Sequence, residues 1–331
     1  MELLISNWMA DLNGRNQNTY KFALQLAILD NCNENQITYA EIAKSFAAKY
    51  WNNVVAYNLR ESINIDRAPY FHQSIIKIAK EHSLEGLYYK HATKKVKNLK
   101  HLIVDDIPGG YRTTLQNPIS RLQAGSDSIR TGTGSPKGEG WLYKWDNKSE
   151  LITLDDHFQN ELFPHRELLK KLTVFHWALF IERYNQAPSV TNKLLDAKKS
   201  RTIKKLVREY IMSMANQKCF YCDETPENVE IDHFIPFAFL FDNPLWDLVY
   251  SCSDCNSGVG GKFEKLPPSF YLDKLYDRNK EMFNEDSEVF EGFKRLDDLQ
   301  DYIKKTYQAC LNAGFQNWQQ SNVKNVSKFS S

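Results

Sequence analysis

The stretch that decides the fold covers residues 219–267 and reads CFYCDETPENVEIDHFIPFAFLFDNPLWDLVYSCSDCNSGVGGKFEKLP. It contains two Cys-x-x-Cys pairs, Cys219 with Cys222 and Cys252 with Cys255. Four thiolates can close a tetrahedral zinc site, and four protein ligands leave no open position for a substrate. We therefore predict a structural zinc ion that joins the two ends of this stretch.

Between the two cysteine pairs, a predicted strand over residues 229–232 ends in the pair Asp232-His233. Adjacent side chains of a strand point to opposite faces, so the carboxylate and the imidazole can serve different tasks. A carboxylate suits a hard metal ion, whereas an imidazole with a pKa near neutrality suits the activation of water. The pair Asp156-His157 is more simply explained as the capped start of a helix.

This combination of motifs resembles the HNH, or ββα-metal, endonucleases, in the branch whose core is held by a four-cysteine zinc, as in McrA-like restriction nucleases. It covers about 50 of the 331 residues, and the combination is far more specific than any one part. Besides the cysteines, the matching residues are Glu230-Ile231-Asp232-His233, Pro236, Trp246-Asp247-Leu248-Val249, Asn256, Gly261-Lys262 and Pro267.

The resemblance implies a catalytic role for four residues. His233 is the general base that deprotonates the attacking water, while Asp232 and Asn256 bind one catalytic cation, Mg²⁺ or Mn²⁺. Asp247 stands where the family has Asn, a residue that helps to orient the histidine. An aspartate there can accept a hydrogen bond from the imidazole and raise its pKa; alternatively, Asn243 fills that role.

Basic residues are concentrated just before the first cysteine pair. Residues 193–208 hold seven of the 42 lysines and arginines and a single acidic residue. Helical spacing predicts a basic face that meets the phosphates of a nucleic acid, formed by Arg201, Lys204, Lys205 and Arg208. Lys262, which follows three nearby glycines, is expected to approach a phosphate as well. The alternative is an ordinary solvated charged face.

The rest of the chain shows mostly helical periodicity, for example over residues 19–32 and 38–50. The predicted fold class is therefore α+β, mostly helical, with a ββα-metal core flanked by helical regions. The predicted domains are 1–123 (helical, with a winged-helix-like form or a role in target recognition), 124–140 (linker), 141–215 (hairpin and helices that pack on the nuclease core), 216–268 (nuclease) and 269–331 (C-terminal helical cover).

Composition narrows the class of protein further. The 42 basic and 41 acidic residues almost cancel, so any affinity for nucleic acid depends on local patches. No apolar run of about 18 residues and no signal peptide occur, which predicts a cytoplasmic protein without a membrane partner. Six cysteines are too few for a disulfide scaffold.

The expected function is a metal-dependent endonuclease that acts on double-stranded DNA. Restriction or anti-phage defence is the setting that the resemblance implies, and a second copy of the chain or a defence-system protein is compatible with it. Two alternatives remain open: a non-catalytic zinc module that binds nucleic acid or protein, and a nuclease directed at RNA, because such a site grips phosphate and sugar rather than bases.

Overall fold

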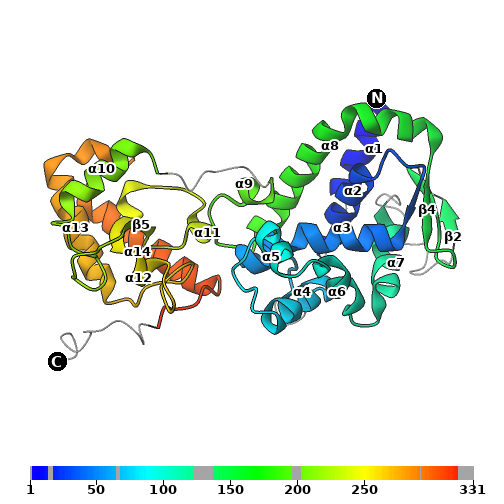
Figure 1. Ribbon diagram of the computed structural model, residues 1–331. Coiled ribbons are helices and arrows are strands. Elements are labelled where there is room, and N and C mark those ends of the chain that lie inside the picture. The colour runs from blue at the N-terminus through cyan, green and yellow to red at the C-terminus, as the bar shows by residue number, and fades with distance from the viewer. Residues whose placement is uncertain are drawn as a thin grey trace. The chain divides into compact units, whose positions relative to one another are not determined.

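The computed structural model divides the chain into two compact units (Figure 1). Unit 1 comprises residues 1–185 and 190–196, and unit 2 comprises residues 186–189 and 197–331. Most residues are helical and the sheets are small and antiparallel, which confirms the predicted α+β class. The structure describes residues 2–13, 18–64, 68–122, 137–139, 141–195, 203–290 and 292–319.

Unit 1 combines helices with a four-stranded antiparallel sheet of order β1-β4-β3-β2. Its helices are α1 (Glu2–Asn13), α2 (Tyr20–Asp30), α3 (Tyr39–Trp51), η1 (Asn52–Ala56), α4 (Tyr70–Glu81), α5 (Tyr89–Lys95), α6 (Leu99–Asp105), α7 (Gly110–Leu122), α8 (Asp156–Glu182) and α9 (Val190–Leu194). Its strands are β1 (Gln36–Thr38), β2 (Lys137–Glu139), β3 (Tyr143–Asp146) and β4 (Leu151–Leu154).

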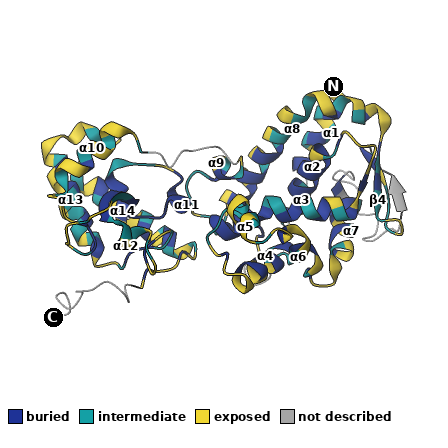
Figure 2. Ribbon diagram, in the orientation of Figure 1, coloured by how far each residue is buried: buried dark blue, intermediate teal, exposed yellow. Residues whose placement is uncertain are grey.

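Helix α3 shows how local signals and packing agree in unit 1. Thr38 caps it: the Thr38 hydroxyl accepts a hydrogen bond from the backbone of Glu41, and the Glu41 carboxylate accepts one from the backbone of Thr38. Its apolar face, with Phe46 and Tyr50, packs into an aromatic core that includes Trp177 of α8, whose ring centroid lies 5.4 Å from that of Tyr50. Figure 2 shows the buried residues concentrated on α2, α3 and one face of α8.

The predicted region 141–215 is divided between the two units, and its residues 141–185 belong to unit 1. Strand β4 pairs with β1, with Ile152 opposite Ile37, and α8 packs against α1 and α2. Helical and strand periodicity identifies the face that is buried but not the element that covers it. Of the predicted linker, residues 137–139 form β2, which pairs with β3, and the remaining residues lie outside the described part of the chain.

Unit 2 is built on a two-stranded antiparallel sheet followed directly by a short helix. Strand β5 pairs with β6, with Asp232 opposite Val249, and Ile211 of α10 packs on Leu248 and Tyr250 of β6. Its elements are α10 (Lys205–Met214), β5 (Val229–His233), α11 (Phe237–Leu240), η3 (Leu245–Asp247), β6 (Leu248–Cys252), α12 (Ser253–Asn256), α13 (Tyr271–Glu285), η4 (Ser287–Val289) and α14 (Leu296–Asn312).

The order β5, β6, α12 is the predicted ββα arrangement. In the part of the chain that is described, no helix has both the length and the apolar character needed to cross a bilayer.

Candidate active site and metal centre

The four cysteines of the two Cys-x-x-Cys pairs converge in unit 2. Their sulfur atoms all lie within 4.8 Å of one another, and the Sγ atoms of Cys222 and Cys252 are 3.8 Å apart. A tetrahedral zinc with Zn–S bonds of about 2.3 Å separates its sulfur ligands by about 3.8 Å. The cluster therefore fits a zinc ion, held by Cys219, Cys222, Cys252 and Cys255.

Backbone N–H groups surround the cluster because each pair lies in a tight turn. Cys252 caps α12 with its sulfur, which accepts a hydrogen bond from the backbone of Cys255 at 3.3 Å, and the sulfur of Cys219 accepts one from Tyr221 at 3.4 Å. Such donors favour thiolates, and a hydrogen bond with Cys255 lowers the pKa of the Cys219 thiol. Asn256 follows Cys255 at the end of α12, so the cluster also positions that side chain.

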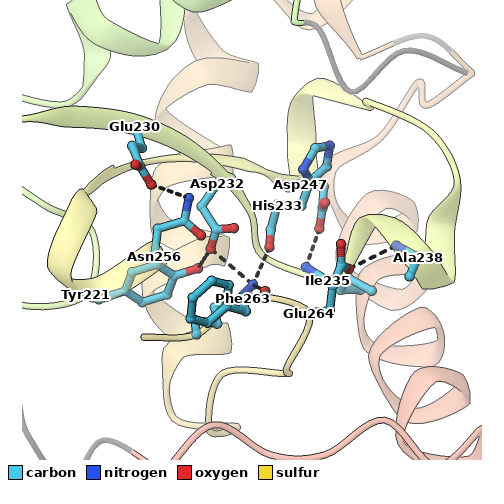
Figure 3. Close-up of polar contacts among 11 residues, drawn as sticks. Tyr221, Glu230, Asp232, His233, Ile235, Ala238, Asp247, Asn256, Phe263 and Glu264 are labelled. Atoms are coloured by element: carbon cyan, nitrogen blue, oxygen red, sulfur yellow. Dashed lines mark hydrogen bonds and ion pairs between the residues drawn. The ribbon is translucent and has the colours of Figure 1, made fainter. Parts of the chain in front are cut away.

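Asp232 lies at the centre of a buried polar network next to the cluster (Figure 3). Its Oδ2 accepts a hydrogen bond from the Tyr221 hydroxyl at 2.7 Å and lies 3.1 Å from the Lys262 ammonium. The ammonium also donates to the backbone oxygen of His233 at 2.7 Å. Two donors thus fix one oxygen of the carboxylate and set its orientation.

The prediction that Lys262 contacts a phosphate is therefore wrong: its side chain is 0% exposed. The sequence predicts that the glycines let the backbone approach a phosphate, but in the structure they instead let the loop before Lys262 fold back on α12. A Cβ atom on Gly261 would lie 2.7 Å from the backbone oxygen of Asn256, and one on Gly258 would lie 2.9 Å from Cα of Asp254. The inward orientation gives the buried charge of Asp232 a partner that it would otherwise lack.

Asn256 is oriented by Glu230, a residue of the motif to which the sequence assigned no separate role. The amide Nδ2 donates to Glu230 Oε2 at 2.8 Å, and the Ser257 hydroxyl donates to Oε1 at 2.7 Å. Since Glu230 lies two residues before Asp232 in β5, both carboxylates lie on one face of the strand. That spacing is the signal that could have revealed this role. The amide oxygen of Asn256 is thereby directed away from Glu230.

His233 contacts Asn243 rather than Asp247. Its Nε2 lies 2.8 Å from Asn243 Oδ1, and because an amide oxygen only accepts, this contact assigns the imidazole proton to Nε2. The Asp247 carboxylate instead accepts from the backbone of Ile235 through Oδ1 at 2.7 Å, and its Oδ2 is buried with no hydrogen-bond partner among the described residues. Of the two alternatives for orienting the histidine, the structure has Asn243 in contact.

Asp247 stabilises the loop between the two strands. Its backbone oxygen accepts from Phe234 at 2.8 Å, so both its main chain and its side chain bind the segment that follows His233. Burial raises the pKa of this carboxyl well above its ordinary value, although the Ile235 N–H and the charges of Lys262 and Arg278 oppose the rise. Asp247 thus holds the backbone of the two residues that follow His233.

Helix α13 adds contacts to this loop that lie outside the motif. Arg278 donates to the backbone oxygen of Trp246 at 2.8 Å and to that of Leu245 at 3.3 Å, and Asn279 donates to Trp246 at 3.1 Å. Burial lowers the pKa of Arg278 to about 10, which still leaves it protonated at neutral pH. The sequence contains no local signal for these contacts, because Arg278 and Asn279 lie more than 30 residues from Trp246.

Three residues of the predicted basic face are exposed at the start of α10. Lys204, Lys205 and Arg208 face the solvent; Lys205 lies 3.6 Å from Glu209, and Arg208 donates to the backbone oxygen of Val229 at 3.3 Å. Arg201 lies outside the described residues. The described part of the basic face therefore has three positive charges, and Glu209 partly balances that of Lys205.

Comparison with known proteins agrees with this geometry. Residues 219–267 match the family model of an HNH endonuclease, and the match covers both cysteine pairs, β5, β6 and α12. It does not specify the McrA-like branch. No curated protein and no solved structure was found to be similar to the chain. Sequence motif, ββα geometry and the family match together identify residues 219–267 as a domain of the HNH endonuclease family.

Proposed function

We propose that this protein is a metal-dependent endonuclease that hydrolyses phosphodiester bonds of DNA. The observation that carries the proposal is the pairing of an oriented histidine with two oriented oxygen donors. His233 is bound through Nε2 to Asn243, Asp232 is fixed through Oδ2, and Asn256 is fixed through Nδ2. Such a set matches what phosphodiester hydrolysis requires.

His233 acts as the general base in this proposal. With its proton on Nε2, the ring takes a proton from the attacking water through Nδ1, the water oxygen bonds to phosphorus, and the bond from phosphorus to the leaving sugar oxygen breaks. The hydrogen bond to Asn243 fixes the ring orientation and stabilises the imidazolium that forms. The leaving oxygen finally takes a proton from water, and the imidazolium gives its proton to the hydroxide that remains, which restores the neutral ring.

Asp232 and Asn256 hold the catalytic cation in this proposal, through the carboxylate and amide oxygens that the network leaves for it. When bound, Mg²⁺ or Mn²⁺ supplies positive charge next to the phosphate, where negative charge grows during the reaction. Lys262 balances the charge of Asp232 at 3.1 Å, so the remaining negative charge beside the proposed ligands is that of Glu230, which already accepts from Asn256 and Ser257. We expect weak cation binding that strengthens when the phosphate is present.

The biological setting is proposed on the family match alone. Unit 1 would select the target, and the exposed Lys204, Lys205 and Arg208 would contact the backbone of double-stranded DNA. One active site of this kind cuts one strand, so a double-strand break would require a second copy or a partner from a defence system. Restriction or anti-phage defence fits such a protein.

The test is a cleavage assay on supercoiled plasmid with Mg²⁺ or Mn²⁺, alongside single-stranded DNA and RNA. We expect nicking by the native protein and a loss of about 10²- to 10⁴-fold in rate for His233→Ala, the usual contribution of a general base. His157→Ala, at an exposed histidine of unit 1, is the matched control. Asn243→Ala should lower the rate less and change its pH dependence.

Three outcomes separate the alternatives. Cleavage of RNA alone would favour an RNA-directed nuclease. Binding of nucleic acid without cleavage, with equal affinity for His233→Ala, would favour a non-catalytic zinc module. If the plasmid stays intact with either metal and no substrate is bound, the proposal is wrong.

A further inference from the structure

Phe263 is an exposed aromatic residue beside the candidate active site. Its side chain is 54% exposed, whereas the neighbouring aromatic residues Tyr221, Phe234 and Phe237 are at most 3% exposed. No ring contact joins Phe263 to another aromatic side chain in the described part of the chain. A large apolar ring that the core does not use is available for a ligand.

The backbone of Phe263 adopts a left-handed conformation with φ of 49°. This region is unfavourable for residues with a Cβ atom, and it persists only where the surrounding structure imposes it. Here the N–H of Phe263 donates to the backbone oxygen of Asn256 at 2.9 Å, and its carbonyl accepts from the Lys262 ammonium at 3.2 Å. Strain of this kind is concentrated at binding and catalytic sites.

The same contacts place the backbone of Phe263 beside the proposed cation ligands. Its N–H is bonded to Asn256, a proposed cation ligand, and its carbonyl shares the Lys262 ammonium with Asp232 Oδ2, 3.1 Å from that nitrogen. Figure 3 shows Phe263 below Asp232 in the view. A nucleotide whose phosphate binds a cation held by Asp232 and Asn256 would therefore lie close to the exposed ring of Phe263.

We propose that Phe263 is a stacking platform for a nucleobase of the strand that is cut, adjacent to the scissile phosphate. The inference rests on the proposed function and extends it to the substrate. Every base has a π face, so stacking on Phe263 adds affinity with little preference for sequence. Bases in a duplex are already stacked, and an unpaired base at this position therefore makes the better substrate.

The experiment measures binding by the full-length protein in the His233→Ala background, which leaves the DNA uncut. The probes are a fluorescently labelled oligo-dT and an abasic strand of the same length and charge, compared by anisotropy. We expect Phe263→Ala to weaken binding of oligo-dT by about 5- to 150-fold, the range for one stacked base. Binding of the abasic strand should not change, and Phe263→Tyr should retain the preference for oligo-dT.

Two further variants separate stacking from packing. Phe263→Leu keeps an apolar side chain without a π face, and it should bind oligo-dT as weakly as Phe263→Ala does. Phe263→Gly relieves the left-handed strain, so it should have a higher Tm than Phe263→Ala and the same weak binding. Retention of oligo-dT binding in Phe263→Leu would contradict stacking.

The outcomes also separate this inference from the proposed nuclease activity. If the native protein cuts plasmid and Phe263→Ala binds both probes as tightly as its parent, stacking is wrong and the nuclease proposal stands. If the native protein cuts nothing but the preference for oligo-dT disappears in Phe263→Ala, the platform is supported and the activity is not.

Discussion

Two buried carboxylates of unit 1 differ from Asp232 of unit 2 in the groups that donate to them. In unit 1, Asp11 accepts from the indole of Trp141 at 3.0 Å, and Glu61 accepts from the indole of Trp177 at 2.8 Å. In unit 2, Asp232 lies against the Lys262 ammonium. A neutral indole cannot balance a charge, so burial raises the pKa of Asp11 and of Glu61 to about 7. Whether a buried carboxylate is structural or part of a charged site thus depends on the group that donates a hydrogen bond to it.

The units also differ in what stabilises them. Unit 1 has an extensive aromatic core around α2, α3 and α8. In the described part of unit 2 the sheet has two strands, an arrangement that is marginal by itself, and the four cysteines of the segment converge in one cluster. We infer that unit 1 depends on apolar packing and unit 2 on its metal and its buried charges.

Removal of the zinc should have the largest effect. A structural zinc is worth about 10 kcal/mol or more to a small domain, so a chelator, or Cys255→Ala, should unfold unit 2 while the helices of unit 1 remain. Calorimetry and limited proteolysis would record the two units separately. Cys310→Ala, at a buried cysteine outside the cluster, should retain the zinc. If unit 2 melts at the same temperature after complete zinc removal, the inference that unit 2 depends on its metal is wrong.

Loss of the buried ammonium should come next. Lys262→Met leaves Asp232 without its charge partner, and breaking a buried pair costs about 3–5 kcal/mol of unfolding free energy. Urea unfolding followed through unit 2 measures this change. Asp232→Asn added to Lys262→Met should recover part of the loss, and Lys280→Met, at an exposed lysine of α13, should have little effect. A loss of unfolding free energy below about 1 kcal/mol would show that the pair of Asp232 and Lys262 does not stabilise unit 2.

The pH dependence of unit 1 should be intermediate in size. Burial raises the pKa of Glu61 from 4.5 to about 7, so between these values the folded state binds more protons than the unfolded state. Its contribution to stability is complete below pH 4.5 and is lost as pH rises through about 7, a change of about 3 kcal/mol. Glu61→Gln should remove this share of the slope from denaturation curves measured between pH 4.5 and 8.

Asp11→Asn should remove a second share of that slope, because burial also raises the pKa of Asp11 from 3.8 to about 7. If the stability of wild-type unit 1 does not fall between pH 4.5 and 8, its buried carboxylates are compensated as Asp232 is in unit 2.

The smallest effect should come from a helix cap in unit 1. Thr38→Ala removes the capping box of α3 and should cost about 1 kcal/mol of unfolding free energy, because the core holds the helix in place. Thermal unfolding measures it, with Thr113→Ala at an exposed position of α7 as the control. A loss above about 3 kcal/mol would mean that unit 1 depends on single local contacts more than on its core.

Most of the candidate site could be predicted because it is local. Cys219, Cys255, Asp232, His233 and Asn256 lie within one segment of 49 residues that matches a family model. In such a segment, tight turns bring the cysteines together, and the alternation of a strand assigns Asp232 and His233 to opposite faces. The orientation of Lys262 could not be predicted in this way. It depends on the buried charge of Asp232, which lies far from Lys262 along the segment and needs a charge partner.

The sequence by itself determined the helical periodicity, the cysteine cluster, the order of the ββα elements and the identity of the candidate base. These depend on spacing along the chain. Only the tertiary structure decided that the β3–β4 hairpin joins unit 1, that Asn243 contacts the imidazole, and that Arg278 of α13 holds the loop between the strands. In each of these three cases the folded chain has chosen one partner, although other residues of the chain could make the same kind of contact. Hydrophobicity and charge state what a side chain requires, whereas packing of the whole chain determines which neighbour meets that requirement.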